Sequence, residues 1–167
     1  FSTFTSQEIM PDINLFGAYE CTADEKGRVM LPASFKKQLS SLLKKGFVIK
    51  QSIFSKSLEM FPTASWNALA NQVNQLNKFN KKNVEFIRLF NYGVRPIELD
   101  GTMRFHIPKD LVDFAGIKKD VVLVGTQDRV EVWDKRTYEK FIKENGSRFE
   151  QLAQEVMGGA SAGNNDK

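Results

Sequence analysis

The chain has 167 residues, of which 41% are hydrophobic and 26% are charged, a balance typical of a globular protein and not of a disordered or collagen-like one. No apolar run approaches the ~20 residues that a transmembrane helix requires, so we expect no membrane partner. With a single cysteine and a single histidine, Cys21 and His106, the chain can form neither an internal disulfide nor a zinc site of the usual kind. We therefore expect no metal, no cofactor, no small-molecule substrate and a cytoplasmic location.

Positive charge is concentrated in the first half of the chain. Residues 1–83 carry 11 basic and 6 acidic residues, a balance of +5, whereas residues 84–167 balance at −1. A one-sided basic field attracts polyanions such as nucleic acid. On charge alone, a merely solvated basic face explains the pattern equally well.

The chain contains two copies of one pattern, offset by 76 residues. The pattern is Asp-x-x-x-Arg followed by an apolar residue and a proline. Its members are Asp24, Arg28 and Pro32 in the first copy, and Asp100, Arg104 and Pro108 in the second. Two further matches follow in the same order. A copy of this size buries little apolar surface alone, so we expect the two copies to interleave their strands around a shared core.

Each copy predicts the same order of elements: a strand, the turn, a second strand, a helix after the proline, two more strands and a closing helix. In the first copy the predicted strands are 17–23, 28–31, 47–51 and 58–61. One predicted helix runs from Pro32 and stops at Gly46, and a second begins near Thr63, where Thr or Ser can cap it, and runs to Leu76. In the second copy they are strands 95–99, 104–107, 120–125 and 129–133, a helix from Pro108 that stops at Gly116, and a helix from Asp134 onward.

These patterns also set domain boundaries. A Gly, Ala, Ser and Asn-rich end is typical of disorder, and an Asn/Lys-rich stretch followed by spaced apolar residues indicates a loop and a short helix. The predicted parts are an N-terminal arm (1–14), a first repeat (15–76), a linker with a short helix (77–92), a second repeat with a C-terminal helix (93–157) and a disordered tail (158–167).

The first turn carries the candidate site. Gly27 permits the positive φ that a tight hairpin loop often needs, and Asp24 can form a charge-assisted pair with Arg28 across the strand ends. Such a pair would hold the guanidinium at the loop, where it meets phosphate or a guanine edge. We expect Asp24 and Gly27 to position the loop. The predicted DNA contacts are Lys26, Arg28, Lys36 and Lys37.

The second turn is predicted to have a structural role. Residues 17–61 balance at +4 but the equivalent residues 93–133 balance at −1. We therefore interpret Asp100 and Arg104 as a pair that locks the turn. Charge reversal at Arg104 is expected to harm folding more than DNA binding, although the sequence leaves open whether this turn contacts DNA.

The segment Tyr19 to Ala33, with its Asp24-to-Arg28 turn, and the second turn from Asp100 to Arg104 resemble the MraZ family, tandem SpoVT-AbrB proteins of the bacterial division and cell-wall gene cluster. The resemblance covers roughly residues 15–145. It departs at Met103, where a glycine is expected next to Arg104, which leaves the geometry of the second turn open. The resemblance implies an α+β fold, with two SpoVT-AbrB-like units forming an intrachain swapped-hairpin β-barrel with flanking helices. It also implies a ring-shaped, nucleoid-associated homo-oligomer that binds repeated sites in double-stranded promoter DNA and represses transcription.

The alternative function is a protein-interaction module of the antitoxin type that uses the same barrel. Antitoxins of this kind usually carry one barrel half and a disordered partner-binding tail, whereas the tail here has no apolar anchor. A third class, an enzyme, would need a nucleophile with its base, a phosphate-binding glycine loop or a metal-ligand spacing. The sequence shows none of these, so we assign no catalytic residue.

Overall fold

A computed structural model describes residues 13–162 of the chain. Residues up to Lys135 form one compact unit and residues from Arg136 onward form a second. The first copy of the repeat supplies β1 (Leu15–Thr22), β2 (Arg28–Met30), β3 (Phe47–Gln51) and β4 (Leu58–Pro62). The second copy supplies β5 (Arg95–Ile97), β6 (Arg104–His106), β7 (Asp120–Gln127) and β8 (Arg129–Asp134).

The two copies exchange strands, as the repeat predicts. Six strands form an antiparallel sheet in the order β1-β7-β8-β4-β3-β5, and β2 pairs with β6 in a separate two-stranded ribbon. The first strand of one copy therefore pairs with the third strand of the other: Leu15 lies opposite Gln127 in β1 and β7, and Val48 lies opposite Pro96 in β3 and β5. Counted within its own copy, each strand of the sheet is in turn a first, third, fourth, fourth, third and first strand. The order is the same from either edge of the sheet, which indicates an internal two-fold relation between the copies.

One core lies beneath both the sheet and the ribbon. Val29 and Phe105, the central residues of the two ribbon strands, are fully buried and belong to the same apolar cluster as the inward side chains of the sheet. Because side chains alternate along a strand, their neighbours on the ribbon face solvent. Other members of the cluster include Leu15, Ile49, Met60, Leu123 and Val132. The tandem α+β fold is thus built on an apolar core shared by both copies.

A short helix follows each ribbon strand. α1 (Ala33–Leu39) buries Phe35 and Leu39, and a 3-10 helix (Ser40–Lys45) continues it. α4 (Lys109–Ala115) buries Leu111 and Ala115. Gly116, in the left-handed conformation with φ 62°, follows α4 as predicted, because that conformation lets the last carbonyls find donors without a Cβ clash.

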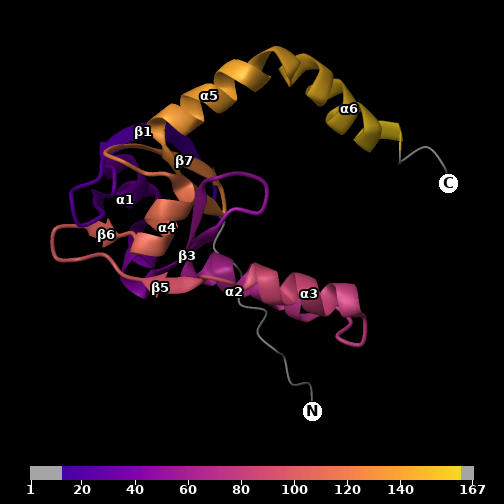
Figure 1. Ribbon diagram of the computed structural model, residues 1–167, viewed down its shortest axis with the longest axis horizontal. Helices are drawn as coiled ribbons and strands as arrows, with labels where there is room; N and C mark the ends of the chain where they lie inside the picture. Colours follow the sequence, from indigo (N-terminus) through magenta and orange to yellow (C-terminus); the bar gives the residue numbers. More distant parts are fainter. Residues whose placement is uncertain (1–12, 163–167) are drawn as a thin grey trace. The chain divides into compact units, whose positions relative to one another are not determined.

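The third and fourth strands lead into a pair of helices, α2 (Thr63–Asn74) and α3 (Lys81–Phe90), which project to one side of the sheet (Figure 1). The indole of Trp66 stacks on the ring of Phe90 at 5.4 Å and thereby joins the two helices. The predicted capping role of Thr63 is wrong. Its hydroxyl donates to the carbonyl oxygens of Lys45 and Gly46 instead, and Pro62 occupies the cap position.

The C-terminal segment is helical. α5 (Lys135–Asn145) is followed by a 3-10 turn (Gly146–Arg148) and α6 (Phe149–Ala162). Residues 158–162, expected in a disordered tail, are therefore part of α6, whose small residues continue a helix begun by stronger helix formers. The predicted arm up to residue 12 and the tail from residue 163 lie outside the described residues. Within residues 13–162, none of the helices has the length and apolar character needed to span a bilayer.

Candidate nucleic-acid interface

The first Asp-x-x-x-Arg turn is organised by one carboxylate. Oδ1 of Asp24 accepts hydrogen bonds from the backbone N–H groups of Lys26 at 3.0 Å and Arg28 at 2.8 Å. Oδ2 accepts from Nε of the Arg28 guanidinium at 2.6 Å. The Arg28 backbone N–H and guanidinium both favour the ionised acid, so the pKa of Asp24 lies below its usual value. The carboxylate therefore fixes the turn and the arginine side chain together.

The second turn repeats this arrangement. Oδ1 of Asp100 accepts from the backbone N–H of Thr102 at 2.9 Å and of Arg104 at 3.0 Å, and Oδ2 accepts from Nε of Arg104 at 3.1 Å. The backbone N–H of Arg104 and the hydroxyl of Thr102 lower the pKa of Asp100 to about 2. The predicted turn-locking pair is present in both copies.

Met103 adopts the conformation that glycine has in the first copy. Its φ is 63°, against 80° for Gly27, and the N–H of each residue donates to the carbonyl of the turn aspartate at 3.0 Å. A left-handed backbone costs roughly 1–2 kcal/mol for a residue with a Cβ. The shared hydrogen bonds impose the turn despite that cost, so the departure from the family pattern leaves its geometry intact.

Strand pairing brings the two arginines to one surface. Arg28 lies opposite His106, and Met30 lies opposite Arg104 in the ribbon. All four side chains face away from buried Val29 and Phe105. They define what we call the ribbon face: Arg28, Met30, Arg104 and His106.

The turns on the ribbon face are coupled electrostatically. Nη1 of Arg104 lies 4.0 Å from Oδ2 of Asp24, so the carboxylate of the first turn also attracts the arginine of the second. The side chains of Arg28 and Arg104 remain 35% and 31% exposed. In each turn the aspartate engages Nε, which leaves the terminal amino groups of the guanidinium with hydrogens to donate. Two tethered, accessible guanidinium groups therefore share one surface.

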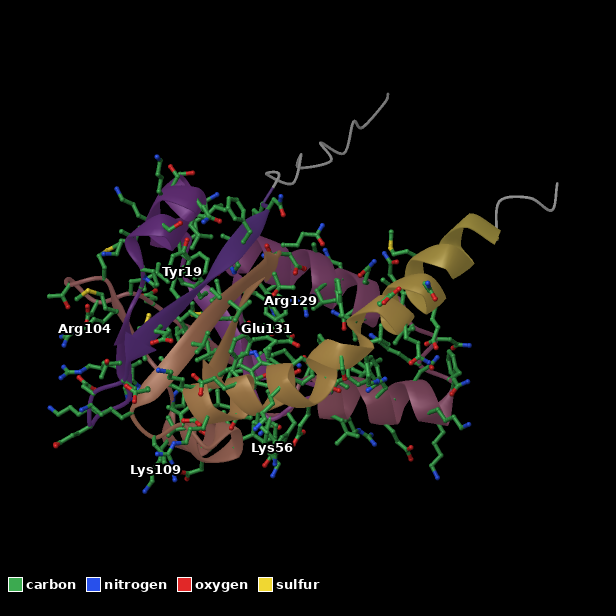
Figure 2. The ribbon with its side chains drawn as sticks, turned by 90° about the horizontal axis from the view of Figure 1, so that it is seen from above. Tyr19, Lys56, Arg104, Lys109, Arg129 and Glu131 are labelled. Atoms are coloured by element: carbon green, nitrogen blue, oxygen red, sulfur yellow. The ribbon has the colours of Figure 1, made fainter. Side chains whose placement is uncertain are left out.

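The swap places helix α4 of the second copy beside the first turn. Lys26, Gly27 and His106 line an open cavity of about 430 Å³ together with Lys109 and Lys118. The sequence did not predict a role for these two lysines, because the net charge of the second copy is negative. Figure 2 shows Lys109 where α4 begins, and Arg104 on the ribbon. The cavity lining holds three acidic residues as well as three lysines, so the lysines lie beside the ribbon face within a lining of balanced charge.

The lysines of α1 lie elsewhere. Sequence proximity predicted that Lys36 and Lys37 would gather around the first turn, but Lys36 lines a different hollow, with Met30 and Tyr19. Met30 is paired with Arg104, so this hollow adjoins the Arg104 end of the ribbon. Lys37 is exposed on α1. The prediction missed this because β2 carries the chain from one end of the ribbon to the other before α1 starts.

The described residues hold no group of three or more His, Cys, Asp or Glu side chains that could bind a metal ion. The chemistry of the ribbon face is that of guanidinium donors in a fixed, exposed arrangement. A two-stranded β-ribbon fits the major groove of B-DNA, where arginine is the commonest donor to the O6 and N7 atoms of guanine. Fold and site together define a tandem-repeat protein that presents paired arginine turns on one ribbon.

Comparison with known proteins agrees with this class. The family model described as "MraZ protein, putative antitoxin-like" matches residues 15–89 and 92–158. A protein of Christiangramia forsetii named transcriptional regulator MraZ is 49% identical over 146 residues, covering 87% of this chain and 94% of the relative. A protein of the same name from Flavobacterium psychrophilum is 48% identical over 144 residues, covering 86% and 92%. The chain belongs to the MraZ family, a family of transcriptional regulators.

Proposed function

We propose that this chain is a sequence-specific DNA-binding repressor of transcription that acts on repeated promoter sites of the division and cell-wall gene cluster as a ring-shaped homo-oligomer. The observation that carries the proposal is the placement of Arg28 and Arg104, each held by its own aspartate, on one exposed ribbon face. The relatives' name, transcriptional regulator, supports the same function. The location that follows is cytoplasmic and nucleoid-associated.

In this proposal the ribbon face enters the major groove. Arg28 and Arg104 donate to guanine edges or to phosphate oxygens, and Asp24 and Asp100 keep them extended in a fixed direction. Lys26, with Lys109 and Lys118 beside it, contacts phosphates flanking the groove, which positions the protein without reading sequence. Lys36 and Lys37 support binding from the Arg104 end. The role of Arg104 thus extends beyond locking the turn.

One ribbon makes few contacts, and assembly compensates for this. Several ribbons held on one particle meet several spaced sites, and linkage of this kind raises apparent affinity by roughly 10²–10⁴. A ring therefore explains how a small face could select a promoter with repeated sites over one with a single site.

The proposal is tested by titrating the full chain with promoter duplex. Arg28→Ala is expected to weaken binding by about 1–3 kcal/mol for each engaged ribbon. A matched control is Lys56→Ala, which removes one exposed positive charge from the β3–β4 loop, at a distance from Arg104 (Figure 2). Unchanged binding by Arg28→Ala at moderate salt would remove Arg28 from the interface.

The second candidate is a protein-interaction module of the antitoxin type, which the words "antitoxin-like" in the family description favour. It predicts a stable complex with a partner protein through the same surface. Promoter titrations at two salt concentrations separate the candidates, because phosphate contacts make DNA affinity fall steeply with salt.

A further inference from the structure

Helix α3 and the turns at its two ends carry apolar side chains that the fold leaves exposed. We call Phe79, Phe86, Leu89 and Tyr92 the α3 stripe, and their side chains are 101%, 41%, 76% and 70% exposed. Phe90 is buried and packs against Trp66, and Phe86 packs against Phe90 with ring centroids 5.8 Å apart, so the exposed side chains border the side of α3 that packs on the fold. Residues 77–92 hold four basic residues and one acidic residue, a balance of +3. The surface is therefore both aromatic and positively charged.

Helix α6 carries a stripe of the opposite charge. We call Phe149, Leu152 and Val156 the α6 stripe; they recur three and four residues apart and are 74%, 37% and 65% exposed. The charged residues of α6 are Glu150 and Glu155, a balance of −2. A 14-residue helix is only marginally stable alone in water, so packing on an apolar surface would stabilise α6.

We propose that the α6 stripe of one copy packs on the α3 stripe of the next copy, and that this contact builds the ring. The inference rests on the ring assembly of the proposed function. The two stripes suit each other in chemistry, since each presents exposed apolar side chains and the segments that carry them have net charges of opposite sign. The occupant of the α3 stripe is thus a second copy of this chain.

The use of two different surfaces has a geometric consequence. A contact between identical surfaces satisfies both partners and stops at a dimer, whereas a head-to-tail contact leaves one free surface at each end and repeats, closing into a ring where its rotation allows. Two different complementary stripes on one chain therefore permit repeated assembly beyond a dimer, which a ring needs. The ribbon face lies outside both stripes and stays available for DNA.

The test uses two full-length variants that each lose one stripe. Leu89→Asp introduces a charge into the α3 stripe, and Val156→Asp introduces one into the α6 stripe. Alone, each variant is expected to be monomeric by light scattering. A mixture of the two retains one intact pair of surfaces and is expected to form a 1:1 dimer and nothing larger. The matched control, Phe54→Asp, changes an apolar side chain that is 95% exposed in the β3–β4 loop and should keep the wild-type mass.

Circular dichroism and thermal melts establish that each variant is folded. A second α6 variant, Val156→Ala, keeps helix propensity while removing apolar contact, and should raise the concentration needed for assembly. Three results would overturn the inference: a wild-type mass for Leu89→Asp, a wild-type mass for Val156→Asp, or a mixture without a dimer. The first two would point to contacts between identical stripes, and the third to packing of α6 within its own chain.

The proposed function fails on different data. Binding of a duplex with a single site depends on the ribbon face, so it is measured separately and is expected to be the same for Leu89→Asp, Val156→Asp and wild type. A monomeric wild-type chain would refute the ring and this inference together but would leave single-site binding to its own titration. Loss of single-site binding by Arg28→Ala with normal assembly would support the function independently of the stripes.

Discussion

The turn that holds Arg28 depends on Gly27, and replacing that glycine should destabilise the protein measurably. Its φ of 80° is left-handed, and a Cβ placed there would lie 3.0 Å from the carbonyl oxygen of Ile107. An alanine in this left-handed conformation destabilises the folded state by roughly 1–2 kcal/mol. Alanine also restricts the unfolded chain, which offsets about 0.4–1 kcal/mol of that loss. With the close approach added, we expect Gly27→Ala to lower the free energy of unfolding by about 1–2 kcal/mol.

In a chain of this size, 1 kcal/mol corresponds to a shift in Tm of roughly 2–4 °C. Gly27→Ala should therefore melt about 2–8 °C below wild type. All samples must have the same protein concentration, because assembly itself raises the apparent Tm. Gly101→Ala is the matched control: Gly101 lies in the second turn, its Cβ would meet nothing within 4 Å, and its φ is not left-handed. It should melt about 1–4 °C above wild type, because only the reduced freedom of the unfolded chain acts at this position.

Met103→Gly should have the opposite effect on stability to Gly27→Ala. Here the wild-type residue bears the cost of a left-handed φ, and glycine removes it. We expect the Tm to rise by about 1–3 °C. If Gly27→Ala melts with wild type, or if Met103→Gly melts well below it, the backbone geometry of the two turns does not control stability in the way described.

Removing single charges should also have measurable effects on stability and DNA binding. The pKa of Asp100 is about 2 in the folded protein, below the ordinary 3.8, so its contribution to stability is complete above pH ~4 and is lost as the pH falls toward 2; acid unfolding of Asp100→Asn should show a shallower loss over that range. Lys109→Ala and Lys118→Ala should each reduce the slope of log K against log salt by about 1 if each lysine contacts a phosphate, and an unchanged slope would remove that lysine from the interface. Asp24→Asn, which keeps hydrogen-bond acceptance but removes the charge holding Arg28, should weaken promoter binding several-fold without abolishing folding, as titration and melting of the same sample would show.

Much of the fold could be predicted from the sequence because the repeat contains residues with strong local conformational preferences. The turns at Asp24 and Asp100, the prolines before α1 and α4 and the glycine after α4 each act within a few residues of their own position. The exchange of strands followed from size, since a single copy cannot bury a core. The hydroxyl of Thr63 escaped prediction because its acceptors lie 17 and 18 residues away.

The site was only partly predictable for the same reason. Local reading identified Asp24, Arg28 and Gly27 correctly as a locked turn, but grouped Lys36 with them because it is near in sequence. The antiparallel pairing of β2 and β6 decides which residues share the ribbon face. Two of its three residue pairs join positions that are 76 or more residues apart in the sequence. The net charge of each copy misled in a similar way, since strand exchange mixes the basic residues of both copies at one surface.

Contact between the ribbon face and DNA underlies the proposed function. A photoreactive benzophenone amino acid placed at Met30, which is 54% exposed and lies opposite Arg104 in the ribbon, reports on that contact. Irradiation with promoter duplex should produce a protein–DNA crosslink at position 30, and the same group at Phe54 in the β3–β4 loop should produce none. A crosslink at Phe54 with none at Met30, under conditions where the duplex is bound, would contradict the claim.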